Sequence, residues 1–313
     1  MKIFDCVDLR DKMENCITTY VNRCVELNIG RPYLTVISVG EDGASNSYVK
    51  SKENACARTG IMFYHMQLGK ETSQEWLEKK IKEVNNNKLV NGLIVQFPID
   101  SWKTISDEVV LNTISPDKDV DGLTPMSMGR LASNNHPIFI PCTAKGVVDI
   151  LTKQHKMDLT SKHVVIIGKG KTSGRPLSLL LPNYGATVSV IDSKTSGATR
   201  KNLLETADII ISCTGRPNSI NVYDICKFKP VTIINIGMNR VMGKLVGDVD
   251  LESFKDYEQK FEYDLSVTAN TLTKSTGLMT VTNLLFNTCL AHLINQVPTE
   301  HFTELNNILK ELY

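Results

Sequence analysis

The sequence lacks the features that would direct a protein to a membrane, to nucleic acid or out of the cell. No apolar run in its 313 residues approaches the length of a membrane span. Its 35 basic and 34 acidic residues nearly cancel, and a formal net charge of +1 gives no electrostatic attraction to nucleic acid or anionic lipid. The first residues carry acids and no long hydrophobic segment, so no secretory signal or transit peptide is apparent. We therefore expect a cytoplasmic protein that binds neither nucleic acid nor membrane.

Paired cysteines and clustered histidines are also absent. The eight cysteines are scattered without a CxxC pair, at positions 6, 16, 24, 56, 142, 213, 226 and 289. In a chain of this length such scatter favours free thiols in a reducing compartment over disulfides or zinc. Asp117, Asp119 and Asp121 alternate as in a calcium loop, but they lack the bidentate glutamate and the flanking helices. We expect no metal.

Residues 164–195 carry the pattern of a dinucleotide-binding turn. The apolar run Val164–Ile167 is too short for a helix and rich in β-branched residues, so it predicts a buried strand. Gly168, Gly170 and Gly174 follow it. At this spacing the first glycine permits a tight bend, the second lets a pyrophosphate approach, and the third lets helix pack on strand.

The residues after the turn complete this pattern. The run 176–181 predicts the start of a helix, whose N-terminal amides and dipole favour a phosphate. A second strand, 186–191, ends in Asp192, where an acid would meet an adenosine ribose. Strand, turn, helix and acid together indicate that the chain binds a dinucleotide.

Strands and helices alternate along the whole chain. Further strands are predicted at 33–39, 62–67, 93–95, 207–213, 232–236 and 266–268, and helices at 7–28, before Gly60, and at 71–85, 144–154 and 280–293. The segment 244–250 is predicted as a polar loop. This alternation implies an α/β fold with a doubly wound parallel sheet and right-handed crossovers. We expect two domains, a dinucleotide-binding domain at 144–280 and a second domain formed by 1–143 plus 281–313.

Three polar residues of the first half stand at informative positions. Tyr48 and Lys52 are four residues apart, so both project from one face of the predicted helix. Gln96 follows a buried strand, and ligands of open α/β sheets sit at the carboxyl ends of strands. A surface lysine beside a half-buried tyrosine, and a glutamine that merely caps a strand, are the structural alternatives.

Five separated segments carry further distinctive patterns. They are Tyr48-x3-Lys52 followed by Gly60-Ile61, Gly92–Pro98 (GLIVQFP), Lys118–Gly122 (KDVDG), Pro141–Thr143 (PCT) and Gly247–Asp250 (GDVD). In residues, order and separation they resemble the bifunctional methylenetetrahydrofolate dehydrogenase/cyclohydrolase family over almost the full chain. The resemblance implies an enzyme that oxidises 5,10-methylenetetrahydrofolate with NAD(P)+ and hydrolyses the 5,10-methenyl product to 10-formyltetrahydrofolate.

The resemblance also implies roles for single residues around a substrate held in a cleft between the domains. Lys52 would be the catalytic cation, and Gln96 would support it. Tyr48 would line the pterin pocket, and Asp121 would hydrogen-bond the pterin ring. Further substrate contacts are implied for Pro98, Gly277 and Thr280. Members commonly form homodimers and supply one-carbon units for purine biosynthesis, so we expect both here.

The cofactor contacts that the turn and the resemblance imply lie in the second half of the chain. They are Thr143, Gly168, Lys169, Gly170, Thr172, Ser173, Gly174, Asp192, Ser193, Lys194, Thr214, Gly215 and Ile236.

Two departures from the family bear on the choice of cofactor. Where the family usually has Arg-Ser after the first glycine, this chain has Lys169 and Gly170, and a lysine meets a phosphate as a point charge instead of a fork. Where the family commonly has histidine this chain has Asp192, and an acid beside the ribose 2′-hydroxyl favours NAD. Lys169 and Lys194 can offset the repulsion of a 2′-phosphate, and the family default is NADP. The sequence leaves NAD and NADP open.

A third departure concerns the loop that normally lies against folate and nicotinamide. The family pattern PVPGGVGPMT is replaced by TLTKSTGLMT at 271–280, which adds Lys274 and keeps only Gly277, Met279 and Thr280. Three alternatives to the bifunctional enzyme therefore stay open: a monofunctional enzyme, a degenerate homologue that only binds folate or dinucleotide, and a dehydrogenase of another small cyclic substrate.

Overall fold

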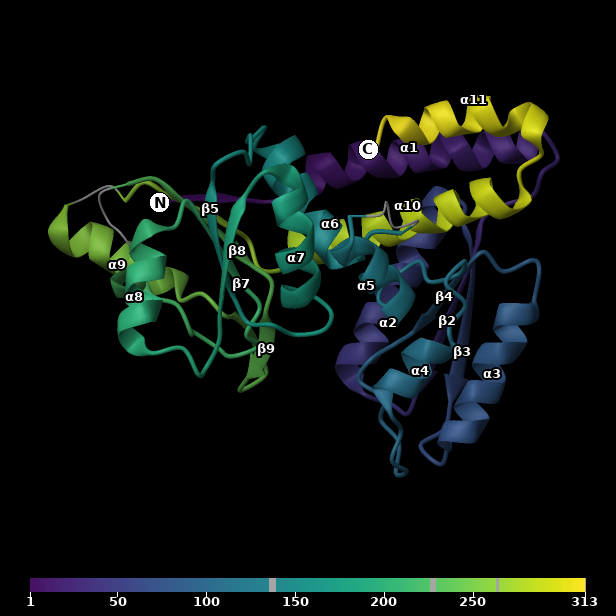
Figure 1. Cartoon of the computed structure of the whole chain (residues 1–313), viewed down its shortest axis with the longest axis horizontal. Coiled ribbons are helices and arrows are strands. Elements are labelled where there is room, and N and C mark those ends of the chain that lie inside the picture. The colour runs from purple at the N-terminus through teal and green to yellow at the C-terminus, as the bar shows by residue number, and fades with distance from the viewer. Residues whose placement is uncertain (135–138, 226–228, 263–264, 313) are drawn as a thin grey trace. The chain divides into compact units, whose positions relative to one another are not determined.

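The computed structural model describes residues 1–134, 139–225, 229–262 and 265–312, and its chain forms two compact units (Figure 1). One unit comprises Met1–Leu9 and Thr143–Thr280, and we call it the glycine-turn unit. The other comprises Arg10–Cys142 and Val281–Tyr313, and we call it the lysine unit because it contains Lys52.

A three-stranded parallel sheet organises the lysine unit. Its order is β3 (Met62–Leu68), β2 (Tyr33–Val39), β4 (Gly92–Val95). The central strand β2 is buried from Leu34 onward, as a strand covered on both faces must be. Because the strands are parallel, their carboxyl ends lie at one edge, and the chain leaves β4 there at Gln96.

Helices α2 (Gly43–Thr59) and α3 (Gln74–Asn86) form the crossovers of this sheet. On α3, Leu77, Ile81 and Val84 recur at helical spacing and are buried in one core cluster with residues of β2 and β4. Full burial of each such side chain contributes about 2 kcal/mol. The remaining helices that lie wholly or largely in this unit are α1 (Val7–Glu26), α4 (Asp107–Thr113), α5 (Pro125–Ala132), α10 (Thr276–Gln296) and α11 (Thr299–Lys310).

A six-stranded parallel sheet organises the glycine-turn unit. Its order is β1 (Lys2–Phe4), β11 (Val267–Asn270), β8 (Val231–Asn235), β7 (Ile209–Ser212), β5 (His163–Ile167), β6 (Thr187–Ile191). Every pairing is parallel, and the strand order reverses at β5, which has β6 on one side and β7 on the other. Such a reversal is the topological switch point at which doubly wound sheets bind their ligands. The expected α/β class with a doubly wound parallel sheet is confirmed.

Strand β1 is a feature that the sequence did not predict. The predicted boundary places the N-terminus in the half of the chain that carries Lys52, whereas Lys2 and Phe4 pair with Thr268 and Asn270 of β11. The strand has three residues, of which only Phe4 is buried, so the alternation of apolar and polar residues that predicts a strand is too short to recognise.

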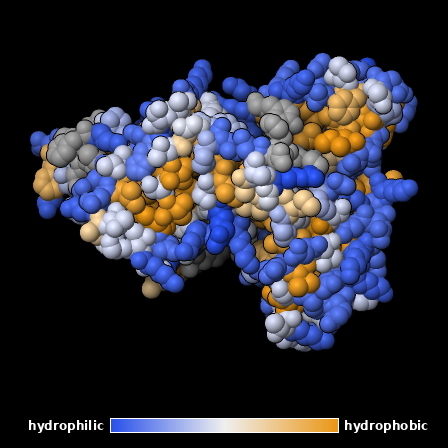
Figure 2. All heavy atoms as spheres, viewed as in Figure 1, coloured by the Kyte–Doolittle hydropathy of each residue, from blue (hydrophilic) through white to orange (hydrophobic). Residues whose placement is uncertain are grey.

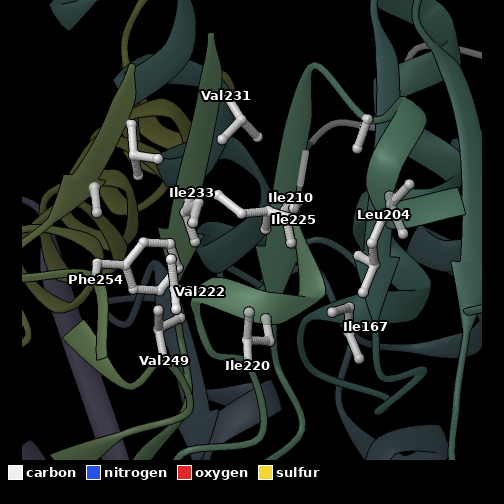
Figure 3. Close-up of a cluster of buried hydrophobic side chains, with 14 of the residues drawn as sticks. Ile167, Leu204, Ile210, Ile220, Val222, Ile225, Val231, Ile233, Val249 and Phe254 are labelled. Atoms are coloured by element: carbon white, nitrogen blue, oxygen red, sulfur yellow. The ribbon is translucent and has the colours of Figure 1, made fainter. Parts of the chain in front are cut away.

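Helices cover the six-stranded sheet and build its core. They are α6 (Cys142–Asp149) with a π-helical turn at Ile150–Gln154, α7 (Gly174–Leu180), α8 (Gly197–Thr206) and α9 (Leu251–Phe261), with short 3₁₀ turns at Leu181–Tyr184 and Val222–Asp224. Figure 3 shows Ile167, Ile210 and Ile233 of the strands in one cluster with Leu204 of α8 and Phe254 of α9.

The predicted polar loop at 244–250 is wrong over its first half. Strand β10 (Lys244–Gly247) pairs antiparallel with β9 (Met238–Val241). The two residues between them, Met242 and Gly243, both have positive φ, as in the turn that joins tight hairpins. Met-Gly is not the usual Asn-Gly signal, which explains why the sequence did not reveal the hairpin.

Helix α10 is the most apolar helix of the chain. Its length and hydropathy alone would suit a membrane span, contrary to the expectation from apolar runs, but 78% of the relevant window is buried inside the protein. Buried polar residues interrupt it, including Asn283, Asn287 and His292. A buried helix of a folded core passes the same test, so the helix is weak evidence for a membrane.

Cysteines and charges are dispersed over the structure as they are over the sequence. None of the described cysteines forms a disulfide, and Cys226 lies outside the described residues. Within the described ranges no group of three or more His, Cys, Asp or Glu side chains is placed to hold a metal ion. On the face drawn in Figure 2, hydrophilic residues cover most of the surface and apolar residues form separate patches.

Candidate active site

Helix α2 carries the lysine around which the site of the lysine unit is built. Asp42 caps the start of the helix, since its carboxylate accepts a hydrogen bond from the Ser45 amide at 2.7 Å. Gly60 ends it in the left-handed conformation, with φ +78°. Tyr48 and Lys52 lie one turn apart, yet Tyr48 is 40% exposed and Lys52 only 9%. The alternative of a surface lysine is therefore excluded.

Gln96 holds the ammonium group of this lysine. Nζ of Lys52 donates to Oε1 of Gln96 at 2.6 Å. The glutamine amide is fixed, because its Nε2 donates to the carbonyl of Phe97 at 2.7 Å and its backbone N–H donates to the carbonyl of Ile37 at 2.8 Å. Gln96 thus presents an uncharged acceptor to Lys52.

The loop KDVDG holds Asp121 through its first two charged residues. Lys118 donates to the carbonyls of Val84 and Asn87, at 2.9 and 2.6 Å, and so caps the end of helix α3. Asp119 is 1% exposed and accepts hydrogen bonds from two backbone amides and one hydroxyl at the start of helix α5. Both side chains are used structurally, so Asp121 is the carboxylate of the motif that remains for a ligand.

Electrostatics couple Asp121 to Lys52. Burial lowers the pKa of Lys52, and the charge of Asp121 opposes that shift. Burial raises the pKa of Asp121, and Lys52 together with a hydrogen bond from the Cys142 thiol opposes it. Burial also raises the pKa of Cys142, so this thiol stays protonated and acts as a donor. The cluster can hold a lysine that loses its proton more readily than a surface lysine does.

The other predicted substrate contacts divide between the two units. Pro98 follows Gln96 by two residues, through a cis peptide bond to Phe97. Gly277 and Thr280 belong to the glycine-turn unit, at the start of helix α10. The hydroxyl of Thr280 lies 3.4 Å from that of Thr143 and donates to the carbonyl of its own helix.

The three glycines of the turn meet different surroundings in the glycine-turn unit. A Cβ on Gly168 would lie 2.5 Å from the carbonyl oxygen of Cys213, and one on Gly174 would lie 2.1 Å from that of Gly168. A Cβ on Gly170 would meet nothing within 4 Å. The first and third glycines are therefore required by packing, whereas the second leaves open space at the surface of the turn, which fits a pyrophosphate.

Asp192 lies at the carboxyl end of β6 and is paired with lysine. Its Oδ2 lies 2.5 Å from Nζ of Lys169, and its Oδ1 accepts the backbone N–H of Lys194 at 2.9 Å. The hydrogen bond from Lys169 is the largest cause of the lowered pKa of Asp192. At neutral pH the carboxylate is therefore an ionised acceptor.

The remaining predicted cofactor residues follow the carboxyl ends of strands in this unit, apart from Thr143 on α6. Those after β5, β6, β7 and β8 are Thr172, Ser173, Ser193, Thr214, Gly215 and Ile236. Thr214 is held by Asp248, a fully buried acid whose Oδ2 accepts the Thr214 amide at 2.7 Å and the Ser212 hydroxyl at 3.0 Å.

The sequence did not indicate two residues that shape these sites. Asp248 lies within the GDVD segment, but its partners come from β7, and only the folded sheet brings them together. Asn287 lies in the most apolar helix of the chain and contacts the segments that carry Asp121 and Cys142. A lone amide in an apolar helical run is the signal that could have indicated it.

Together these features define a class of protein. A doubly wound sheet with a glycine turn at its switch point, and a second α/β unit with a buried lysine beside a carboxylate, are typical of a dinucleotide-dependent enzyme. Family models confirm and sharpen this assignment. Residues 4–121 match the catalytic domain of tetrahydrofolate dehydrogenase/cyclohydrolase, and residues 141–296 match its NAD(P)-binding domain.

Individual relatives agree with the family models. The bifunctional protein FolD of Aquifex aeolicus is 40% identical over 301 residues, which cover 94% of this chain and 98% of that protein. The crystal structure of FolD from Campylobacter jejuni has a TM-score of 0.84 and 32% identity, covering 93% of this chain and 98% of its own. FolD of Trypanosoma brucei, complexed with NADP and an inhibitor, has a TM-score of 0.83 and 27% identity, covering 93% and 96%. The chain belongs to the tetrahydrofolate dehydrogenase/cyclohydrolase family.

Proposed function

We propose that the chain catalyses two consecutive reactions of one-carbon metabolism, with Lys52 as the group that moves a proton in the second. The first is oxidation of 5,10-methylenetetrahydrofolate, and the second is hydrolysis of the 5,10-methenyl product to 10-formyltetrahydrofolate. The observation that carries the proposal is the buried Lys52, hydrogen-bonded to Gln96 and coupled to Asp121, in a chain of this family.

The oxidation requires positioning more than acid or base. A bound NAD(P) would supply the acceptor for the hydride that leaves the methylene carbon. The protein has to hold the pterin in a near-attack geometry and to tolerate the positive charge that the substrate gains. As an anion, Asp121 can accept hydrogen bonds from the amino and ring N–H groups of a pterin, which are of the charge-assisted kind. Tyr48, one helical turn before Lys52 and 40% exposed, would lie along the same ligand.

The hydrolysis requires proton transfer near neutral pH. Water adds to the methenyl carbon and gives up one proton. The bond from that carbon to N5 then breaks while the remaining hydroxyl becomes the formyl carbonyl and N5 takes up a proton, so that one proton is released overall. An unperturbed lysine, with a pKa near 10.4, holds its own proton too tightly to remove one from water. Burial lowers that pKa, and Gln96 does not restore it because the amide carries no charge. Lys52 can therefore act as general base toward the attacking water.

For the cofactor we propose NAD in preference to NADP. Gly170 leaves room for the pyrophosphate, and Asp192 offers an ionised acceptor to ribose hydroxyls. A 2′-phosphate would bring further negative charge beside that carboxylate. Lys169 is already paired with the Asp192 carboxylate, so it would have to break this ion pair in order to neutralise the 2′-phosphate.

The altered loop at 271–280 is held in place by its own polar residues. Asn270 donates to the hydroxyl of Ser275 at 2.7 Å, and that hydroxyl donates to the carbonyl of Thr271 at 2.5 Å. The backbone of Lys274 accepts the amide of Cys6 at 2.7 Å. A loop anchored in this way supports a working dehydrogenase over a degenerate homologue.

A spectrophotometric assay tests the proposal. With methylenetetrahydrofolate and NAD the absorbance of the methenyl product should rise and then decay, faster than with NADP. Formation without enzyme-dependent decay would indicate a monofunctional dehydrogenase, and binding without turnover a degenerate homologue. We further propose a cytoplasmic homodimer that supplies one-carbon units to purine biosynthesis, which ultracentrifugation and a folate-dependent growth assay can test.

A further inference from the structure

Asn287 of helix α10 bonds to the two backbone segments that frame Asp121. Its side chain is 4% exposed, and its Nδ2 lies 2.8 Å from the carbonyl of Val120, 3.0 Å from that of Ile140 and 3.5 Å from Sγ of Cys142. The two hydrogens of one amide thus serve acceptors on both segments. All of these residues belong to the lysine unit.

Both peptide groups beside Asp121 are held, the one before it by Asn287 directly and the one after it by Cys142, in the segment that Asn287 also contacts. The Val120 carbonyl, in the peptide group before Asp121, accepts from Asn287 and from the Cys142 thiol at 3.2 Å. The Asp121 carbonyl, in the peptide group after it, accepts the amide of Cys142 at 3.3 Å. The segments also touch directly, because a Cβ on Gly122 would lie 2.7 Å from the nitrogen of Pro141.

A buried asparagine is unexpected in an apolar helix, and the need of two backbone carbonyls, those of Val120 and Ile140, for a donor explains its presence. The carbonyls of Val120 and Ile140 lie outside the strands, so an apolar residue at 287 would deprive both of this donor. The Val120 carbonyl would keep only the weak thiol donor of Cys142, and the Ile140 carbonyl would lose its bond to Asn287, so the backbone would relax toward other partners. Any such movement carries Asp121 with it, since its own peptide groups would move.

We propose that Asn287 is a positioning residue for Asp121, acting directly through the peptide group before that aspartate and, by way of the segment 140–142, through the one after it. The inference rests on the proposed function, in which the Asp121 carboxylate faces the substrate and Lys52. Asn287 itself touches neither of them.

The test compares Asn287→Leu with Asn295→Leu. Leucine is close to asparagine in size, adds no charge and removes the donor. Asn295 lies on the same helix, is exposed and donates to the carbonyl of Asp117 at 3.4 Å, so it is a matched control. We expect Asn287→Leu to lower kcat/KM for methenyltetrahydrofolate hydrolysis on the order of 100-fold, as misplacement of a positioned group does. KM for the dinucleotide should not change, and Asn295→Leu should behave as wild type.

A second readout separates positioning from a purely structural role. The charge of Asp121 raises the pKa of Lys52, so displacement of the carboxylate should move the rising limb of the hydrolysis pH profile to lower pH. A variant that melts earlier but keeps the wild-type kcat/KM and pH profile below its melting temperature would overturn the inference. If Asn287→Leu does not fold, Asn287→Ser, which keeps one donor, should show the same changes in smaller measure, and its failure to do so overturns the inference equally.

Failure of the proposed function would be visible separately. A wild-type protein without hydrolase activity contradicts that function. The positioning of Asp121 is then read from the NMR titration of the Lys52 side chain, which should occur at lower pH in Asn287→Leu than in wild type. An unchanged titration would overturn the inference.

Discussion

The ammonium of Lys52 and the amide oxygen of Gln96 lie 2.6 Å apart, and the amide nitrogen of Gln96 is turned away toward the carbonyl of Phe97. The hydrogen-bond acceptor of this buried lysine thus carries no charge, and the countercharge comes from Asp121. A glutamate would occupy the same space but would stabilise the charged form of the lysine. The uncharged partner keeps the lysine competent as a base.

Gln96→Glu should therefore shift hydrolysis to higher pH. The carboxylate raises the pKa of Lys52, so a smaller fraction of the lysine is neutral at pH 7, and the rising limb of the pH profile moves toward alkaline values. Stopped-flow decay of methenyltetrahydrofolate across the pH range measures this shift. Gln67→Glu is the control, because Gln67 lies near the carboxyl end of β3 in the same sheet but donates to the carbonyl of Gly40. An unshifted profile in Gln96→Glu argues against Lys52 as the base.

Lys52→Met should abolish the hydrolysis. Loss of a general base removes typically 100-fold to 10,000-fold in rate, and methionine fills the volume without a proton acceptor. Lys50→Met is the control, since Lys50 lies on the same helix but is exposed and paired with Glu53. Retention of more than about a tenth of the wild-type rate in Lys52→Met would be incompatible with that loss and would refute the assignment.

Asp192→Ser should change the preference between dinucleotides. Without the carboxylate, the side chain of Lys169 loses its ion-pair partner and can meet a 2′-phosphate, with the charge of Lys194 nearby. We expect kcat/KM for NADP to rise relative to NAD on the order of 10-fold, which corresponds to about 1.4 kcal/mol. Steady-state oxidation with each dinucleotide measures the ratio. Asp158→Ser, at an exposed turn of the same unit, should leave the ratio unchanged. The same ratio in Asp192→Ser as in wild type would show that this acid does not face the ribose.

Whether a feature of the fold could be predicted from the sequence depends on whether the residues that determine it are close together in the chain. The glycine turn was predictable because Gly168 and Gly174 are required by contacts within one strand–turn–helix unit. The strand over 33–39 was predicted with its observed bounds because a buried parallel strand is an apolar run. Strand β1 has three residues and was missed, since its pairing with β11 depends on residues more than 260 positions away.

The features of the active site also differ in whether residues close in sequence determine them. The spacing of Tyr48 and Lys52 correctly placed both on one helix, but it did not show that only the lysine is buried. The role of Lys118 as a cap of α3 and that of Asn287 as a support for Asp121 depend on contacts between elements distant in sequence, whereas Asp119 bonds to residues just ahead of it, such as Thr124. No local pattern encodes the two distant contacts, which is why the motif KDVDG could be matched to a family without showing what its lysine does.

A buried histidine should make the stability of the protein depend on pH in the mildly acidic range. His292 is fully buried on helix α10, and one ring nitrogen, Nδ1, lies 2.9 Å from the hydroxyl of Tyr20. Among the described residues its other ring nitrogen, Nε2, has no hydrogen-bond partner. Burial lowers the pKa of His292 from 6.5 to about 4.

The sign of the effect follows from proton binding. Between about pH 6.5 and pH 4 the unfolded chain binds a proton at His292 that the folded protein does not, so the free energy of unfolding falls as pH falls through this window. A shift of this size corresponds to about 3 kcal/mol, lost progressively by pH 4 and constant below it. Urea unfolding at a series of pH values measures the slope for wild type and for His292→Gln, which cannot take up a proton. The slope should be shallower in His292→Gln, whereas His301→Gln, on the partly exposed face of helix α11, should retain it. Equal slopes in wild type and His292→Gln would mean that another group is responsible for the acid sensitivity.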